Sequence, residues 1–271
     1  MPVDPDLRTL NIDIPAQPQA LVQLSLLLAE TDVNLQDVAT LIEADMALAS
    51  AVLKAVNSSL YGLRGRVQTV QQAITYLGMR EVSAVTYEMG LRAVFPPAPE
   101  LEPVWNRAGL RGLVMGRLGQ LLNVEAWAAH SAGLFEECGK AVLYRHAPDH
   151  YRSMLRATVS DAELVTLEHT GFGVSHDALG AALCESWGLA GPAVLSVRHH
   201  VQFQTNGELP AHLQRATVCA LSLIAHAVMN EPATVGEVAA RVATQAQLEP
   251  ALVQRAAVQV CDQIEAARTS V

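Results

Sequence analysis

The segment from Asn57 to Val82 reads NSSLYGLRGRVQTVQQAITYLGMREV. Its two glycines, Gly62 and Gly65, predict a turn after a helix that ends near Asn57. The stretch TVQQAITYLG predicts a second helix, which Gly78 ends, and MREVSAVTYEMGLRAVF predicts a third. This segment therefore joins three expected helices, the first two through a glycine-containing turn.

The rest of the chain has the same helical character. Of the 271 residues, 51% are hydrophobic and only 4% are aromatic, with alanine, leucine and valine prominent. Few segments alternate polar and apolar residues, as half-buried strands do. Asn34 and Asp45 each stand directly before an expected helix and are predicted to cap it. We therefore predict an all-α protein.

Four prolines in the stretch FPPAPELEP, which ends at Pro103, mark the sharpest break in the chain, because proline is excluded from the interior of a regular helix. This break predicts an N-terminal helical lobe at 10–95, a proline-rich linker at 96–103 and a second helical lobe at 104–208. Residues 209–271 are expected to form a C-terminal helical extension, which either completes the second lobe or supplies a dimer interface.

The charge balance argues against a nucleic-acid partner. The formal net charge is −9, with 27 acidic residues against 18 lysines and arginines. Proteins that bind nucleic acids usually carry a dense basic patch, and the closest basic pair here is Arg64 with Arg66. The longest apolar run, around His226, is too short to cross a bilayer, and the N-terminus does not resemble a signal peptide.

The four cysteines are far apart and form no CxxC pair. We interpret them as reduced thiols of a cytoplasmic protein. Common enzyme motifs are missing, among them the phosphate loop, HExxH and GxSxG. His146 and His150 have the spacing of a zinc site, but Pro148 between them predicts an interruption of the helix, so we interpret this stretch as an interhelical loop.

The segment quoted first resembles the signature of the HDOD family, the "HD-related output domain" of bacterial signalling proteins. The family commonly shows Asn-Ser, a Tyr-Gly turn, a short basic segment and an Ala-Ile helix that ends in Leu-Gly. The stretch LIEADMALASAVLKAVN also resembles the family's Ile-x-x-Asp-Pro-x-Leu pattern, with Met46 in place of proline. Further on, GFGVSHDALGAALCESWGL and VRHH resemble its second-lobe helices, so the resemblance implies an HDOD-like domain at 10–208. The residues that match the signature are Asn57, Ser58, Tyr61, Gly62, Ala73, Ile74, Leu77 and Gly78.

Catalytic members of the wider HD superfamily hold divalent metal with a first His, a His-Asp pair and a later Asp, and the metal activates water. On that pattern Arg107 takes the place of the first His, and Glu136 and Glu137 take the place of the His-Asp pair. Ser222 falls near the later Asp. The histidines that match those retained in metal-binding relatives are His176, His199 and His200.

These replacements imply a protein without catalytic residues, metal or cofactor, because arginine is permanently cationic and serine is a poor ligand. We expect Arg107 to pair with the two glutamates where an ion once lay. The resemblance thus implies a non-catalytic bacterial signalling or regulatory protein, a pseudoenzyme. It would act through contacts with signalling proteins or by sensing a small ligand such as a nucleotide second messenger, and homodimer formation is also considered.

Two alternatives stay open. One is a residual metal-dependent phosphohydrolase of nucleotides or cyclic dinucleotides, which would use Glu136, Glu137, His176 and one of His199 or His200. The other is a module that binds a cyclic dinucleotide or another anion through Arg107 together with Arg64 or Arg66, since arginines hold phosphate in a forked geometry.

Overall fold

The computed structural model describes residues 12–30, 32–58, 61 and 65–269 of the chain. Every regular element among these residues is a helix, so the predicted all-α class is confirmed. None of these helices is both long enough and apolar enough to cross a membrane. Gly62 of the expected turn and Arg64 of the expected basic pair lie outside the described residues.

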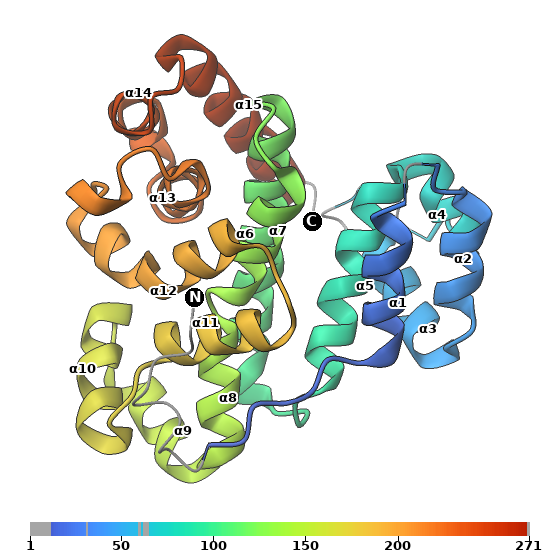
Figure 1. The fold of residues 1–271 in the computed structure, drawn as a ribbon, viewed down its shortest axis with the longest axis horizontal. Coiled ribbons are helices and arrows are strands. Elements are labelled where there is room, and N and C mark those ends of the chain that lie inside the picture. The colour runs from blue at the N-terminus through green and yellow to red at the C-terminus, as the bar shows by residue number, and fades with distance from the viewer. Residues whose placement is uncertain (1–11, 31, 59–60, 62–64, 270–271) are drawn as a thin grey trace. The chain divides into compact units, whose positions relative to one another are not determined.

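The described chain divides into two compact units (Figure 1). The smaller unit comprises residues 16–96 and 262–269, and the larger unit comprises residues 12–15 and 97–261. The division between positions 96 and 97 falls within the proline-rich stretch. The smaller unit holds helices α1 (Gln19–Leu28), α2 (Leu35–Glu43), α3 (Met46–Val56), α4 (Val70–Leu77) and α5 (Met79–Ala93).

The larger unit contains most of the remaining helices, and the last helix, α15, contributes residues to both units. Short 3-10 helices at Pro99–Leu101, Ala211–Leu213 and Pro232–Thr234 separate some of its elements. Its helices are α6 (Glu102–Leu121), α7 (Ala126–Phe135), α8 (Cys138–His146), α9 (Pro148–Ala157), α10 (Asp161–Phe172), α11 (His176–Ser186), α12 (Gly191–Asn206), α13 (Thr217–Asn230), α14 (Val235–Ala246) and α15 (Pro250–Thr269).

The smaller unit shows how its sequence signals become structure. The Asn34 side chain accepts a hydrogen bond from Gln36 N, and Asp45 Oδ1 accepts from Ala47 N and Leu48 N, so both predicted caps are confirmed. Such caps satisfy backbone donors that the first helical turn leaves without partners. Gly78 ends α4 with φ of 86°, in the region that favours glycine.

Asn57 closes the turn between α3 and α4. Its Nδ2 donates to the carbonyl oxygens of Leu53, at 2.9 Å, and Val67, at 2.8 Å. Its Oδ1 accepts from Val67 N at 3.2 Å, so one amide side chain bonds both sides of the connection. The aliphatic residues of α2 to α5, including Ile42, Val52 and Val82, then form the buried core of this unit.

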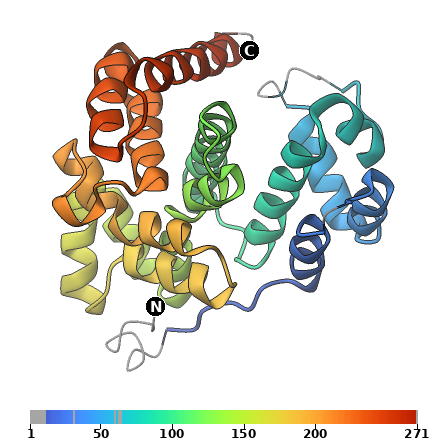
Figure 2. The same cartoon turned by 45° about the horizontal axis from the view of Figure 1, so that its top comes forward.

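In the larger unit, α6 and α7 run side by side and make its most extensive helix pair (Figures 1 and 2). Two glycines allow backbones to approach closely at this centre. A Cβ at Gly133 of α7 would lie 2.8 Å from the backbone of Arg111, and one at Gly139 of α8 would lie 1.8 Å from His176 O. Close packing at these glycines brings α6, α8 and the start of α11 around the same point.

Replacement of Gly139 by alanine tests this packing. We expect Gly139→Ala to lower the stability of the protein by about 3 kcal/mol or more, because the added methyl group meets rigid backbone. Gly191→Ala is the matched control, since nothing lies within 4 Å of a Cβ at that position. Urea unfolding followed by circular dichroism measures both, and equal stability of the two variants would contradict the proposed contact.

Candidate functional site

The candidate site lies where α7 passes into α8, in the stretch GLFEECGK from Gly133 to Lys140. Glu136 follows the last residue of α7, and Glu137 precedes the first residue of α8. Both glutamates are fully buried. Because burial penalises a charged carboxylate unless it is paired, the residues that contact these two side chains define the site.

Glu136 is held by one arginine and two neutral donors. Arg111 Nη1 of α6 lies 2.5 Å from Glu136 Oε2, and both side chains are 0% exposed. Gln204 Nε2 donates to Oε2 at 3.0 Å, and Ser196 Oγ donates to Oε1 at 3.2 Å. Both carboxylate oxygens of Glu136 therefore already accept hydrogen bonds from protein groups.

Glu137 meets three cations. Its Oε2 accepts from Lys140 Nζ at 2.6 Å, and its Oε1 lies 3.2 Å from Arg107 Nε and 3.5 Å from Arg111 Nη2. Lys140 Nζ also donates to Asp161 Oδ1 at 2.7 Å. Lys140 thus bridges the carboxylate after α7 to the first residue of α10.

The opposite charges of these groups keep one another ionised. Burial by itself would raise the pKa of the Glu137 carboxyl, but the nearby cations, Lys140 foremost, outweigh burial and lower this pKa to about 2. Burial by itself would lower the pKa of Lys140, but Glu137 and Asp161 raise it overall. Both partners of the Lys140–Glu137 pair are therefore charged at neutral pH.

Three cations and three carboxylates make up this group, so their charges balance. A divalent ion at the glutamates would add two buried positive charges beside Arg111, whose guanidinium already forms an ion pair with Glu136. The two glutamate positions therefore do not fit a metal ion. We call this group the ion-pair cluster, and it consists of Arg107, Arg111, Glu136, Glu137, Lys140 and Asp161.

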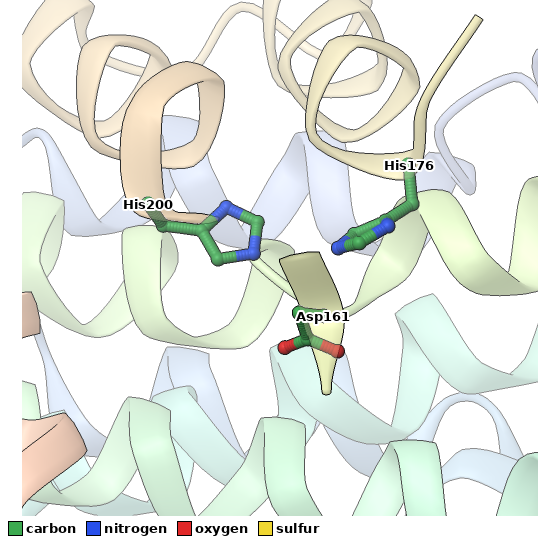
Figure 3. A group of neighbouring side chains, drawn as sticks. All are labelled: Asp161, His176 and His200. Carbon is green, nitrogen blue, oxygen red and sulfur yellow. The ribbon is translucent and has the colours of Figure 1, made fainter. Parts of the chain in front are cut away.

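A second group lies beside the first and shares Asp161 with it. His176 is the first residue of α11, His200 lies in α12, and Asp161 is the first residue of α10 (Figure 3). One ligand atom from each side chain lies within 4.8 Å of the other two, and the two imidazole rings are 5.4 Å apart between centroids. We call Asp161, His176 and His200 the histidine cluster.

Each histidine ring is oriented by a bond to Nδ1. Glu168 lies 2.8 Å from His176 Nδ1 through Oε2, which also accepts from His176 N, and Tyr151 OH donates to Glu168 Oε1 at 2.6 Å. His200 Nδ1 lies 2.8 Å from Val197 O. Burial lowers the pKa of both imidazoles, but Glu168 reverses this for His176, whose pKa is raised overall.

The third histidine of the matched set, His199, faces a different way. It is partly exposed, and its ring lies 5.4 Å from that of His212. Adjacent residues on a helix point about 100° apart, which explains why His200 joins the cluster and His199 does not.

The other candidates are placed as follows. Proline interrupts the helix as predicted, but the expected loop is wrong, because α8 ends at His146 and α9 begins at Pro148. The rings of His146 and His150 contact Phe172. Ser222 is buried and accepts a hydrogen bond from Gln204. The exposed Arg66 belongs to the smaller unit and Arg107 to the larger.

A cavity of about 480 Å³ opens beside the two clusters. Arg107, Lys140 and Asp161 line it, together with Gln204 and His226. His226 Nδ1 lies 3.0 Å from Gln204 Oε1, so the wall on this side is hydrogen-bonded back to Glu136 through Gln204. The cavity therefore presents both positive and negative side chains to a ligand.

Several residues of the site were not predicted from the sequence. Arg107 was expected to pair with both glutamates and pairs with Glu137, but the arginine bound to Glu136 is Arg111, one helical turn further along α6. The i,i+4 spacing of the two arginines would have indicated it. Glu168, eight residues before His176, follows no helical spacing, because α10 ends between them.

Comparison with known proteins identifies the family. The model of the HDOD domain matches residues 14–203, and the chain belongs to the HDOD family. A protein of Treponema pallidum (strain Nichols), named only as uncharacterized, is 29% identical over 195 residues. This match covers 69% of the chain and 37% of the Treponema protein, so the chain spans little more than a third of that relative.

Solved structures share the fold. An HDOD domain protein with unknown function from Geobacter sulfurreducens has a TM-score of 0.68 at 15% identity, covering 97% of this chain and 95% of that one. A "putative phosphohydrolase" from Shewanella amazonensis SB2B has a TM-score of 0.69 at 14% identity, with 98% and 97% covered. A "putative signal transduction protein" from Marinobacter aquaeolei VT8 has a TM-score of 0.69 at 22% identity, with 95% and 61% covered.

The two arginines of α6 are expected to differ in their contribution to stability. Arg111→Met leaves Glu136 buried without its cation and should cost about 3–5 kcal/mol of unfolding free energy. Arg107 is 42% exposed, so Arg107→Met should cost about 1 kcal/mol or less. Chemical denaturation of both variants measures the difference. Equal losses of unfolding free energy would show that the buried Arg111–Glu136 pair stabilises the protein no more than the exposed Arg107 does.

Proposed function

We infer that this HDOD protein is a non-catalytic regulatory module of bacterial signalling. The observation that carries this inference is the buried contact of 2.5 Å between Arg111 and Glu136. A guanidinium at this place supplies the positive charge that a metal ion supplies in HD hydrolases. It keeps its proton at any physiological pH and cannot activate water as a Lewis acid does.

Lys140 supports the same conclusion at the second glutamate. Its ammonium lies between Glu137 and Asp161, at 2.6 and 2.7 Å, and these contacts use one oxygen of each carboxylate. Arg107 and Arg111 both lie near the other oxygen of Glu137. Two metal-ligand positions of the HD pattern are thereby committed to internal ion pairs. We propose that the fold was kept and that its hydrolytic centre became a rigid support.

The cavity beside the ion-pair cluster gives the module a place to receive a small ligand. A volume of about 480 Å³ falls within the range of ordinary ligand pockets, and Arg107 offers donors at its wall. Glu137 and Asp161 also line it, which disfavours a ligand that carries only negative charge. We propose that ligand binding here, or contact with a signalling protein, provides the regulatory input or output.

The absence of hydrolysis can be tested directly. We expect no turnover of bis-p-nitrophenyl phosphate, nucleotides or cyclic dinucleotides with Mg²⁺, Mn²⁺, Fe²⁺ or Zn²⁺. The double variant Glu136→His with Glu137→Asp should also be inactive, because Arg107 and Arg111 remain. Metal-dependent turnover that Glu137→Gln abolishes would refute the non-catalytic assignment and support the residual hydrolase.

Ligand sensing has its own test. Calorimetric titration with mononucleotides and cyclic dinucleotides should detect binding. Arg107→Gln should lower the affinity about tenfold, because a charged hydrogen bond contributes about 1.5–3 kcal/mol. Arg66→Gln is the control, because Arg66 does not line the cavity. Loss of binding in the Arg66→Gln variant, with unchanged binding in the Arg107→Gln variant, would contradict this cavity as the binding site.

A further inference from the structure

The histidine cluster contains buried imidazole nitrogens that are able to bind a ligand. Among the described residues, the Nε2 atoms of His176 and His200 have no hydrogen-bond partner, although both side chains are completely buried. An unpaired polar nitrogen in the protein interior costs free energy. Two of them on neighbouring rings, with a carboxylate beside them, point to a missing ligand that both nitrogens share (Figure 3).

The hydrogen bonds at Nδ1 decide what kind of ligand this is. Val197 O can only accept, so His200 Nδ1 carries the proton and the neutral ring presents a lone pair at Nε2. The Glu168 carboxylate holds Nδ1 of His176 in the same way. A histidine whose Nδ1–H is fixed by a carboxylate or a backbone carbonyl is the usual arrangement of a metal-binding imidazole.

The supporting residues are themselves fixed. Glu168 accepts hydrogen bonds from Tyr151 OH and from the backbone nitrogen of His176, so its carboxylate cannot turn away from the ring. His200 bonds a carbonyl one turn earlier in its own helix. The two imidazoles are thus oriented before any ion arrives, and Asp161 is the adjustable member.

We propose that Asp161, His176 and His200 bind one divalent transition-metal ion, with Zn²⁺ as the reference ion. Two imidazole nitrogens and one carboxylate suit Zn²⁺, Fe²⁺ or Co²⁺, whereas Mg²⁺ and Ca²⁺ prefer oxygen ligands. Ligation at about 2.0–2.2 Å brings ligand atoms within about 3.4 Å of each other. The widest separation, at most 4.8 Å, must therefore close by a little more than an ångström.

Charge and access are both compatible with this ion. When Glu168 is included with the ion-pair cluster, four carboxylates face three cations, so these charged groups together carry a net negative charge. Asp161 lines the cavity and its side chain is 24% exposed. An ion can therefore reach Asp161 from the cavity and then bind the two buried nitrogens.

Such an ion would join the beginnings of α10 and α11 to α12. It includes His176 and His200, which match histidines of metal-binding relatives, but it uses Asp161 and neither Glu136 nor Glu137. The proposal goes beyond the regulatory function inferred above, since metal binding and hydrolysis are measured separately. Zinc binding without turnover supports both inferences, turnover in the zinc-loaded protein overturns only the non-catalytic one, and failure to bind overturns only the metal site.

The experiment uses the full chain after treatment with a chelator. Zn²⁺ is titrated in competition with a chromophoric chelator, and we expect one ion per chain. His176→Gln, His200→Gln and Asp161→Asn should each weaken binding more than about 100-fold, and Glu168→Gln about 10- to 100-fold. Excess Zn²⁺ should raise the Tm of the parent protein by about 5 °C, with little change in the His200→Gln variant.

His199→Gln is the matched control, because it removes the neighbouring histidine but leaves the cluster intact. It should bind as the parent chain does. Co²⁺ serves as a second probe, since visible bands without a thiolate charge-transfer band indicate nitrogen and oxygen ligands and exclude the buried cysteines. Equal weakening by His199→Gln and His200→Gln, a thiolate band, or no bound Zn²⁺ or Co²⁺ would each overturn the proposal. Circular dichroism of the variants verifies that each one folds.

Discussion

A buried contact between Arg111 and Glu136 constrains the rest of the larger unit, because neither side chain has access to water. Taking two charges out of solvent costs free energy, and hydrogen-bond partners for the charged groups offset part of that cost. Ser196 and Gln204 of α12 provide those partners for Glu136. The requirement fixes the separation of α6, α12 and the α7–α8 junction, and Lys140 extends the network to α10 through Asp161.

Close packing makes that network possible. Glycines at 133 and 139 let backbones approach where any side chain would collide, which brings the two glutamates within reach of α6 and places the start of α11 against α8. His176 and Glu168 are consequently buried together beside the ion pairs. Small residues thus contribute to the site without touching a ligand, and the chemistry of the cavity wall depends on their size.

Asp161 links two kinds of chemistry in one interior. Through Oδ1 it accepts from Lys140, and it also lies beside the two unpaired imidazole nitrogens. The larger unit therefore contains buried ion pairs at the two glutamates and, sharing Asp161 with them, an arrangement suited to metal. This contrast is consistent with a regulatory role, because the contacts at the glutamates rigidify the centre while the aspartate faces the cavity.

Local signals in the sequence were sufficient for the helical class, for the caps at Asn34 and Asp45 and for the family signature around Asn57, because caps and turns depend on neighbours a few residues away. The replacement of the His-Asp pair by Glu136 and Glu137 was also visible in the sequence. The identity of Arg111 as the partner of Glu136, and the meeting of Asp161, His176 and His200, were decided by tertiary packing. Their side chains come from α6, α10, α11 and α12, and no spacing along the chain encodes a distance between helices.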